Sequence, residues 1–194
     1  MVLPLTKFFE QPRRPPIAYI PHPIKFGGLD LGKRVDASAF VCLELKDGKL
    51  EQVGQHTWNH VNYAIVSSDL AEIQKKEKCR KIGFDKTGVG DAVAELFPRG
   101  ISLLPIDTTN MTKNHIINTI RALFQKDKLR ITRKGVLFNQ ILEQEQDITP
   151  AGNITYRHPS SSHDDLFWAL GYACYVALPF VNRPKSYTRS LNPA

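Results

Sequence analysis

Cysteine is scarce in this chain, and its three thiols lie far apart. Cys42, Cys79 and Cys174 form neither a C-x-x-C pair nor a cluster with histidine. Structural zinc sites need such clusters, and disulfide frameworks in small proteins use a larger, even-numbered set of cysteines. The sequence therefore predicts neither, and we expect buried, inert thiols in a reducing compartment.

Long apolar runs are also missing. The stretch 166–181 comes closest, but it contains Gly171 and Pro179 and is shorter than the ~20 residues that span a bilayer. At the N-terminus, proline and charged residues interrupt any apolar core of a signal peptide. We expect a soluble protein that is neither secreted nor inserted in a membrane.

The chain also lacks a functional nucleotide-binding loop. Residues 27–33 have the spacing G-x-x-x-x-G-K of a P-loop, but Arg34 stands where a Ser or Thr would bind magnesium. The segment also leads into a predicted hairpin, whereas a P-loop opens a helix. An ATP-binding or sugar-kinase-like protein is therefore the disfavoured alternative, although Lys33 and Arg34 stay candidates for contact with a phosphate backbone.

Positive charge, by contrast, is plentiful. The chain has 26 Lys and Arg against 19 Asp and Glu, a net charge of +7, and segments 75–81 and 126–134 are especially basic. Such an excess is typical of proteins that bind nucleic acid, although it also serves solubility. Phosphate contacts would give affinity without sequence preference. The candidate DNA contacts are Lys33, Arg34, Lys86, Lys128, Arg130, Arg133 and Lys134.

The order of the predicted elements indicates the fold class. Hydrophobic residues make up 42% of the 194 residues, enough for one domain, which we place at 25–181 between a proline-rich linker or arm at 1–24 and a flexible tail at 182–194. Strands are predicted at 26–31, 37–45, 50–58, 82–85, 101–106, 129–131 and 153–156. Helices are predicted at 62–78, 89–97, 112–126, 136–146 and 163–178. This order predicts an α/β fold, a mixed sheet of three antiparallel strands followed by α-β-α-β-α, with helices on both faces.

Carboxylates interrupt or follow the most apolar segments at three places. Asp30 is the only polar side chain in the run 26–31, and a buried charge is costly unless it is paired or binds a metal. Asp85 ends the short apolar strand 82–85, and Asp164-Asp165 opens the last helix. The alternatives are a solvent-facing strand end for Asp30, a turn or cap for Asp85, and a helix cap for one of the pair.

The acids as a set favour a metal site. Carboxylates are the ligands that suit magnesium and manganese, and two such ions about 3.5–4 Å apart promote phosphodiester cleavage. We therefore take Asp30, Asp85, Asp164 and Asp165 as candidate catalytic and metal-binding residues. His163 is a candidate to orient the ligands from outside the metal sphere, or an occasional ligand. Asp36 is a weaker candidate for the same supporting role, since a solvated turn explains it equally well.

These segments resemble the C-terminal nuclease domain of the large terminase subunit of tailed viruses, approximately over 26–177. The resemblance rests on Gly28-Leu-Asp-Leu-Gly32 with Asp36 following, on Phe84-Asp-Lys-Thr-Gly-Val-Gly90, and on His163-Asp-Asp165-Leu. It implies a ribonuclease H-like fold with a central first strand, two Mg²⁺ or Mn²⁺ ions, and cleavage of concatemeric double-stranded viral DNA during genome packaging.

The resemblance also implies a setting and partners. The setting is the cytoplasm of an infected host cell, and the partners are a packaging ATPase domain or subunit, the small terminase subunit and the portal. Walker motifs are absent from this sequence, so no motor activity is expected from it. Another ribonuclease H-like nuclease, such as a Holliday-junction resolvase, and a non-catalytic DNA-binding module are the alternatives.

Overall fold

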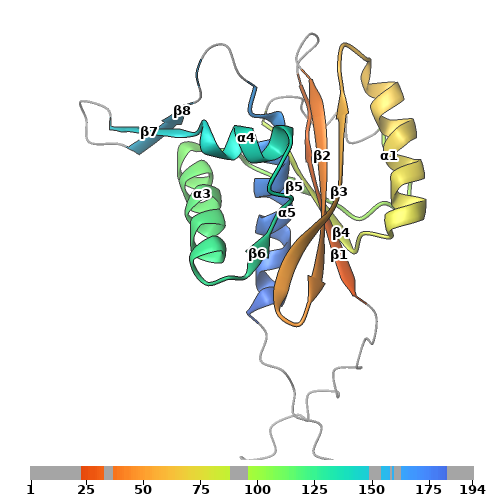
Figure 1. The fold of residues 1–194 in the computed structure, drawn as a ribbon. Coiled ribbons are helices and arrows are strands. Elements are labelled where there is room, and N and C mark those ends of the chain that lie inside the picture. Colours follow the sequence, from red (N-terminus) through yellow and green to blue (C-terminus); the bar gives the residue numbers. More distant parts are fainter. Residues whose placement is uncertain are drawn as a thin grey trace, which may run out of the picture.

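Six strands form one mixed sheet in the order β5-β4-β1-β2-β3-β6, so the first strand is central (Figure 1). The computed structural model describes residues 23–32, 37–87, 96–148, 154–157, 159 and 163–182. The strands are β1 (Ile24–Asp30), β2 (Ser38–Lys46), β3 (Lys49–Trp58), β4 (Lys81–Asp85), β5 (Leu103–Ile106) and β6 (Leu129–Arg130). The first three are antiparallel, while β4 runs parallel to β1, β5 to β4 and β6 to β3.

The sequence Lys46-Asp-Gly-Lys49 predicts a hairpin turn between β2 and β3, and the structure confirms it. Asp47 and Gly48 form the turn with φ angles of 52° and 78°. Two consecutive positive φ angles are what a type I′ turn requires, and its twist matches that of the flanking strands. The local Asp-Gly signal therefore accounts for the turn, while the pairing of β2 with β3 shifts register between Cys42 and Leu43.

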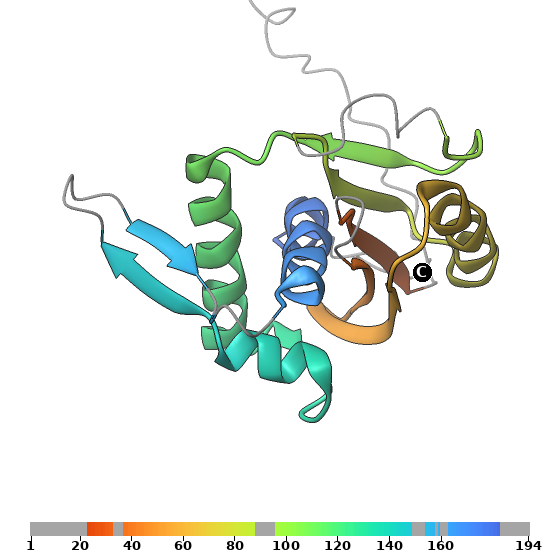
Figure 2. The same cartoon turned by 90° about the horizontal axis from the view of Figure 1, so that it is seen from above.

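Helices cover both faces of the sheet (Figures 1 and 2). On one face lies α1 (Tyr63–Glu77), and on the other lie α3 (Asn110–Gln125), α4 (Val136–Leu142) and α5 (Asp165–Val181). Of these, α5 packs directly on β1, β2 and β4, and α3 and α4 pack on α5. Because α5 is enclosed in this way, it is apolar around most of its circumference. No helix among the described residues is long and apolar enough to cross a membrane.

Alternation along the strands divides the core in two. Phe26 of β1 joins the cluster under α5, whereas Leu29 joins the cluster under α1. In β2, Val41 and Phe40 divide in the same way. Side chains of a strand point alternately to the two faces, and a sheet covered on both faces is consequently apolar on both. This explains why the early strands have continuous rather than alternating hydrophobicity.

Two predicted helices end elsewhere in the structure. The helix predicted at 136–146 ends at Leu142, and Glu145–Ile148 forms strand β7, which pairs with β8 (Ile154–Arg157) in a separate two-stranded ribbon. Glu and Gln at 143–146 favour helix, but pairing with β8 overrides this weak preference. The last helix starts at Asp165 and runs beyond the predicted end through Pro179 to Val181, and Phe180 in this extension packs on Phe26 with ring centroids 4.9 Å apart.

Some predictions fall where the structure gives no description. These are most of the N-terminal arm at 1–24, most of the tail at 182–194, and all of the helix at 89–97 except Leu96 and Phe97, which are not helical. Among the site candidates, Lys33, Arg34 and Asp36 also lie outside the described residues.

Candidate metal centre

Asp30 and Asp85 end two adjacent parallel strands. The register of β1 and β4 pairs Leu29 with Phe84, so the residues that follow lie side by side at the carboxyl edge of the sheet. Carboxyl ends of parallel strands are where α/β proteins place their functional groups. The structure thus brings together two candidates that lie far apart in the sequence.

Glycines fix the direction in which these two carboxylates point. A Cβ built on Gly28 would lie 1.9 Å from the carbonyl oxygen of Ala169, and one on Gly83 would lie 2.9 Å from that of Tyr172. Both glycines therefore face α5 at very close range. Asp30 and Asp85 stand two residues further along their strands, and side chains two residues apart share a face. Both carboxylates consequently lie on the α5 side of the sheet.

The start of α5 is level with these strand ends. The helix runs antiparallel to β1, since Phe26 meets Phe180 while Gly28 meets Ala169. Two strand residues advance about 6.6 Å and four helical residues about 6 Å. One step of two residues from Gly28 to Asp30 therefore matches one helical turn from Ala169 back to Asp165.

Electrostatics agree with this placement. Burial raises the pKa of Asp30 well above its usual value, and the charges of Asp165, Asp164 and Asp85 raise it further, in that order of size. The ammonium group of Lys113 acts in the opposite direction. The four predicted carboxylates therefore share one region, and among them the charge of Asp165 has the largest effect on the pKa of Asp30.

Asp85 is held by its own backbone turn. Its Oδ1 accepts a hydrogen bond of 2.7 Å from the N–H of Thr87, and Thr87 Oγ1 accepts one of 2.9 Å from the N–H of Thr108. The turn role that sequence offered as an alternative is therefore present, and one oxygen of Asp85 is engaged in it. The neighbouring Lys86, a predicted DNA contact, forms an ion pair of 3.0 Å with Asp107.

Asp164 is held by an aromatic side chain that sequence reasoning missed. The indole Nε1 of Trp168 donates a hydrogen bond of 2.7 Å to Asp164 Oδ2, and the Nζ of Lys113 lies 5.2 Å from the centre of the Trp168 ring. The spacing of four residues between Asp164 and Trp168 was a visible signal for this contact. Lys113 had no such signal, because only the packing of α3 against α5 brings it here.

A buried tyrosine lies beneath the carboxylates. Burial raises the pKa of Tyr172, and the charges of Asp30 and Asp85 raise it further, while a hydrogen bond with Thr108 acts against them. The ring of Trp168 stacks on that of Tyr172 with centroids 6.3 Å apart. Tyr172 stays a neutral hydroxyl at physiological pH, and it links the first two turns of α5 to the region of Asp30.

A cavity of about 300 Å³ adjoins Asp165 on the side of β3. His163, the predicted supporting residue, lines it together with His60 and Asn59 from the segment after β3. His60 has a φ of 55°, a left-handed conformation that is uncommon outside glycine. Polar groups from β3 and from the segment after it thus approach the start of α5.

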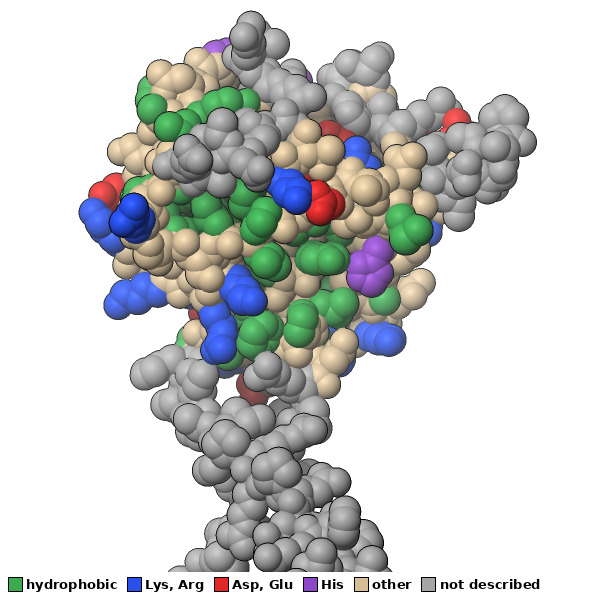
Figure 3. All heavy atoms as spheres, turned by 180° about the vertical axis from the view of Figure 1, so that it is seen from behind, with side chains coloured by type: hydrophobic (Ala, Val, Ile, Leu, Met, Phe, Trp, Pro, Cys, Tyr) green, Lys and Arg blue, Asp and Glu red, His purple; other side chains and the backbone are tan. Residues whose placement is uncertain are grey.

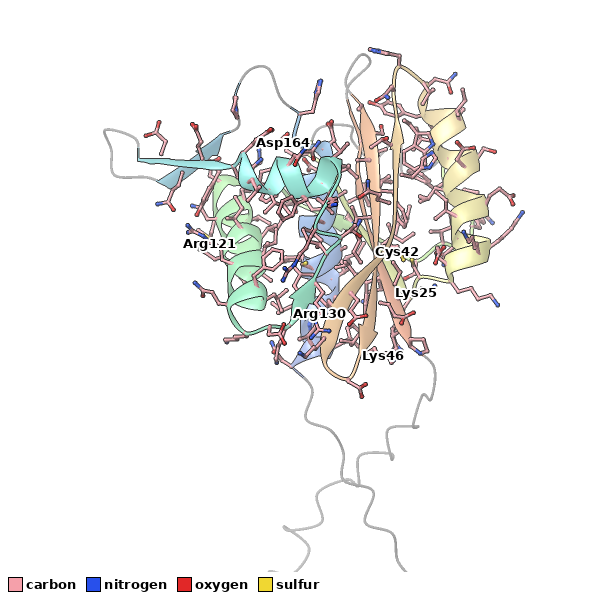
Figure 4. The ribbon with its side chains drawn as sticks, viewed as in Figure 1. Lys25, Cys42, Lys46, Arg121, Arg130 and Asp164 are labelled. Carbon is pink, nitrogen blue, oxygen red and sulfur yellow. The ribbon has the colours of Figure 1, made fainter. Side chains whose placement is uncertain are left out.

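The other described candidates for DNA contact lie in one segment, residues 128–134, and Arg130 and Arg133 line one cavity. Arg130 lies toward the end of the sheet opposite Asp164 (Figure 4), and its guanidinium is 3.5 Å from carboxylates of both Glu51 and Asp127. Lys128 precedes it just before β6, and Arg133 and Lys134 are exposed ahead of α4. On the face in Figure 3, Lys and Arg surround an area of hydrophobic side chains without forming one patch. Their role in binding DNA stays a prediction.

The donor chemistry of the carboxylate cluster fits a hard divalent cation. Its side chains offer oxygen, and their mutual repulsion around Asp30 is the kind that a bound cation relieves. Among the described residues, however, no group of three or more His, Cys, Asp or Glu side chains is already arranged to hold an ion.

Comparison with solved structures identifies the class of the fold. The large terminase nuclease of thermophilic phage G20c matches with a TM-score of 0.70 and 25% identity over 80% of this chain and 83% of its own. The same nuclease with bound magnesium matches with a TM-score of 0.72 and 24% identity over 81% and 83%. The large terminase of bacteriophage HK97 matches with a TM-score of 0.67 and 18% identity over 80% of this chain, which is 40% of its own length.

The fold is therefore ribonuclease H-like, as predicted. A family model described as the terminase RNaseH-like domain matches residues 27–175, and the chain belongs to this family. The predicted resemblance is thereby confirmed. No curated protein matches the chain.

Proposed function

We propose that this chain is the nuclease of a phage DNA-packaging terminase and that it cuts concatemeric double-stranded viral DNA with the help of divalent metal ions. The observation that carries the proposal is the convergence of Asp30, Asp85 and Asp165, from two strands and a helix, on one edge of a fold of this family. Structures of the G20c nuclease with bound magnesium and cobalt support the same chemistry.

Three carboxylates act together in this proposal. Asp30, Asp85 through its oxygen that is not engaged with Thr87, and Asp165 from α5 would together hold the metal ions. Magnesium or manganese ions held there would activate the attacking water and stabilise the leaving oxygen. His163 and Asp36 support the ligands from outside, and double-stranded DNA approaches the carboxyl edge of the sheet.

The two consecutive acids at the start of α5 are expected to differ. Asp164 Oδ2 is engaged with Trp168, whereas Asp165 acts most strongly on Asp30. We predict that Asp165→Asn lowers cleavage more than Asp164→Asn, for which a loss of about 10–100-fold is expected, as for residues that orient a ligand. Cleavage rates over a manganese titration test this prediction. A larger loss for Asp164→Asn would make Asp164 the metal ligand and Asp165 the residue that orients it.

Plasmid digestion with manganese, magnesium or a chelator tests the function as a whole. We expect nicking and linearisation with either metal, none with the chelator, and none by Asp30→Ala or Asp85→Ala. Asp47→Asn, an exposed carboxylate in the β2–β3 turn, serves as the control that keeps activity. Undiminished cutting by both site variants would refute the ligand assignment, and a preference for four-way junctions over linear duplex would favour a resolvase.

The biological setting follows from the same proposal. The nuclease would act in the cytoplasm of the infected host cell, next to a packaging ATPase domain or subunit, the small terminase subunit and the portal. The HK97 large terminase supports the first of these partners, since this chain matches only 40% of its length.

A further inference from the structure

Lys113 is the cation with the largest electrostatic influence on Asp30, and the carboxylates around Asp30 would otherwise repel DNA. It lies in the first turn of α3, which begins after Thr109 caps the helix, and it is the only basic residue among the main influences on Asp30. Four carboxylates at one edge are unfavourable for a polyanionic substrate, so a positive charge there has a clear electrostatic value.

The ammonium group of Lys113 is available to a ligand. Within the described part of the chain it forms no ion pair, whereas Lys86, the other lysine beside the carboxylates, is paired with Asp107. Lys113 is exposed and rests over the face of Trp168 at 5.2 Å. A cation over an aromatic face is attracted by the ring, and its outer N–H groups stay free to donate.

Trp168 links this lysine to the carboxylates. The same indole that carries Lys113 on its face donates its N–H to Asp164, and its ring stacks on Tyr172 in the core. The lysine is therefore seated on a rigid part of α5, at a set position relative to Asp164 and Asp165. A phosphate contact placed in this way would hold the DNA strand in a fixed register with the metal ligands.

We propose that Lys113, seated on Trp168, binds a phosphate of the DNA substrate next to the one that is cut. This proposal rests on the proposed nuclease function, because it assigns a substrate contact to the same site. Trp168 is a positioning residue in it, and the ligand is a backbone phosphate of duplex DNA.

Duplex binding without cleavage tests the contact. In the Asp30→Asn chain, fluorescence anisotropy with a labelled duplex is measured from low to moderate salt for Lys113→Met, Lys113→Arg and Lys126→Met. Lys126 caps the other end of α3 and is the matched control. We expect Lys113→Met to bind roughly tenfold more weakly at low salt and to lower the slope of log K against log salt by about 1. Lys113→Arg and Lys126→Met should bind as the parent does.

The seat on Trp168 is tested separately. Trp168→Phe keeps an aromatic face under the ammonium group, while Trp168→Leu removes it, so only the leucine variant should weaken DNA binding. Thermal unfolding of each variant identifies a loss that is due to misfolding. An equal loss of DNA affinity in both well-folded variants would contradict a role of the Trp168 ring in positioning Lys113.

Two outcomes would overturn the phosphate contact. One is unchanged duplex affinity and salt slope for Lys113→Met. The other is tighter manganese binding by Lys113→Met in the otherwise wild-type chain with unchanged affinity for DNA, which would make Lys113 a counter-ion of the carboxylates only. Failure of the nuclease proposal looks different, because the wild-type chain would then not cut DNA with any metal while the effect of Lys113→Met on binding persisted.

Discussion

Replacing Asp30 with asparagine is expected to abolish cleavage while making the metal-free protein more stable. The loss of activity should exceed about 100-fold, because even residues that only orient a ligand typically contribute 10–100-fold. Rates of plasmid cleavage at saturating manganese measure it. A variant that keeps more than a tenth of the activity would remove Asp30 from the centre of the site.

The gain in stability follows from the raised pKa of Asp30. Its folded pKa lies above the value of ~3.9 in an unfolded chain, so the folded state binds its proton more tightly. Stability of the metal-free wild type therefore falls as pH rises from about 4 through the folded pKa, and the penalty is fully present above it. The Asp30→Asn variant lacks this penalty, and each kcal/mol that is relieved raises the melting temperature by about 2–4 °C.

With metal ions present, the wild type should become more stable than Asp30→Asn. Manganese or magnesium binds the folded wild type and raises its melting temperature, whereas Asp30→Asn should respond weakly. Thermal scans at pH 5 and pH 7.5, with and without metal, separate the two effects. Equal melting temperatures of the metal-free proteins at both pH values would contradict the repulsion described around Asp30.

The second large effect is expected at Gly28. In Gly28→Ala the new Cβ would lie 1.9 Å from Ala169 O and 2.4 Å from Ala173 N, both backbone atoms of α5. Rotation of a side chain cannot relieve such contacts, so the helix must move away from the sheet. We expect a loss of about 3 kcal/mol or more in the free energy of unfolding. Urea denaturation followed by circular dichroism measures it.

A glycine elsewhere in the same sheet, in β3, provides the matched control. At Gly54 in β3 an added Cβ meets only Cys42 Cβ at 3.7 Å, an ordinary contact. Gly54→Ala should therefore change stability by less than about 1 kcal/mol. Similar stability of the two variants would mean that α5 does not approach β1 as closely as described. Because α5 carries Asp165, Gly28→Ala should also lose cleavage under conditions where it is still folded.

Local patterns were sufficient for the parts of the site that each strand or helix provides by itself. Asp30 and Asp85 follow apolar strands, and Asp164-Asp165 opens an apolar helix, so each could be recognised within a few residues of sequence. The mixed α/β sheet was predicted from the order of elements, whereas the central position of the first strand came from the family resemblance.

Contacts between distant elements could not be read in this way. Lys113 looks like any exposed lysine of an amphipathic helix until α3 packs on α5 and places it over Trp168. The segment Glu143–Gln146 has helical composition, and only its pairing with β8 makes part of it a strand. The predicted contacts Lys128 and Arg130 were chosen from charge density, which carries no information about which end of the sheet they occupy.

The close packing of α5 on Gly28 has a consequence for the order of folding. Asp30 belongs to the first strand and Asp165 to the last helix, so the carboxylate set is complete only after the two ends of the domain have met. Pairings between such distant segments form slowly, since a long loop must close first. Partly folded chains, with α5 undocked, would hold Asp30 and Asp85 without their third partner. If the proposed function is correct, such partly folded chains would lack the complete carboxylate set and would not cut DNA.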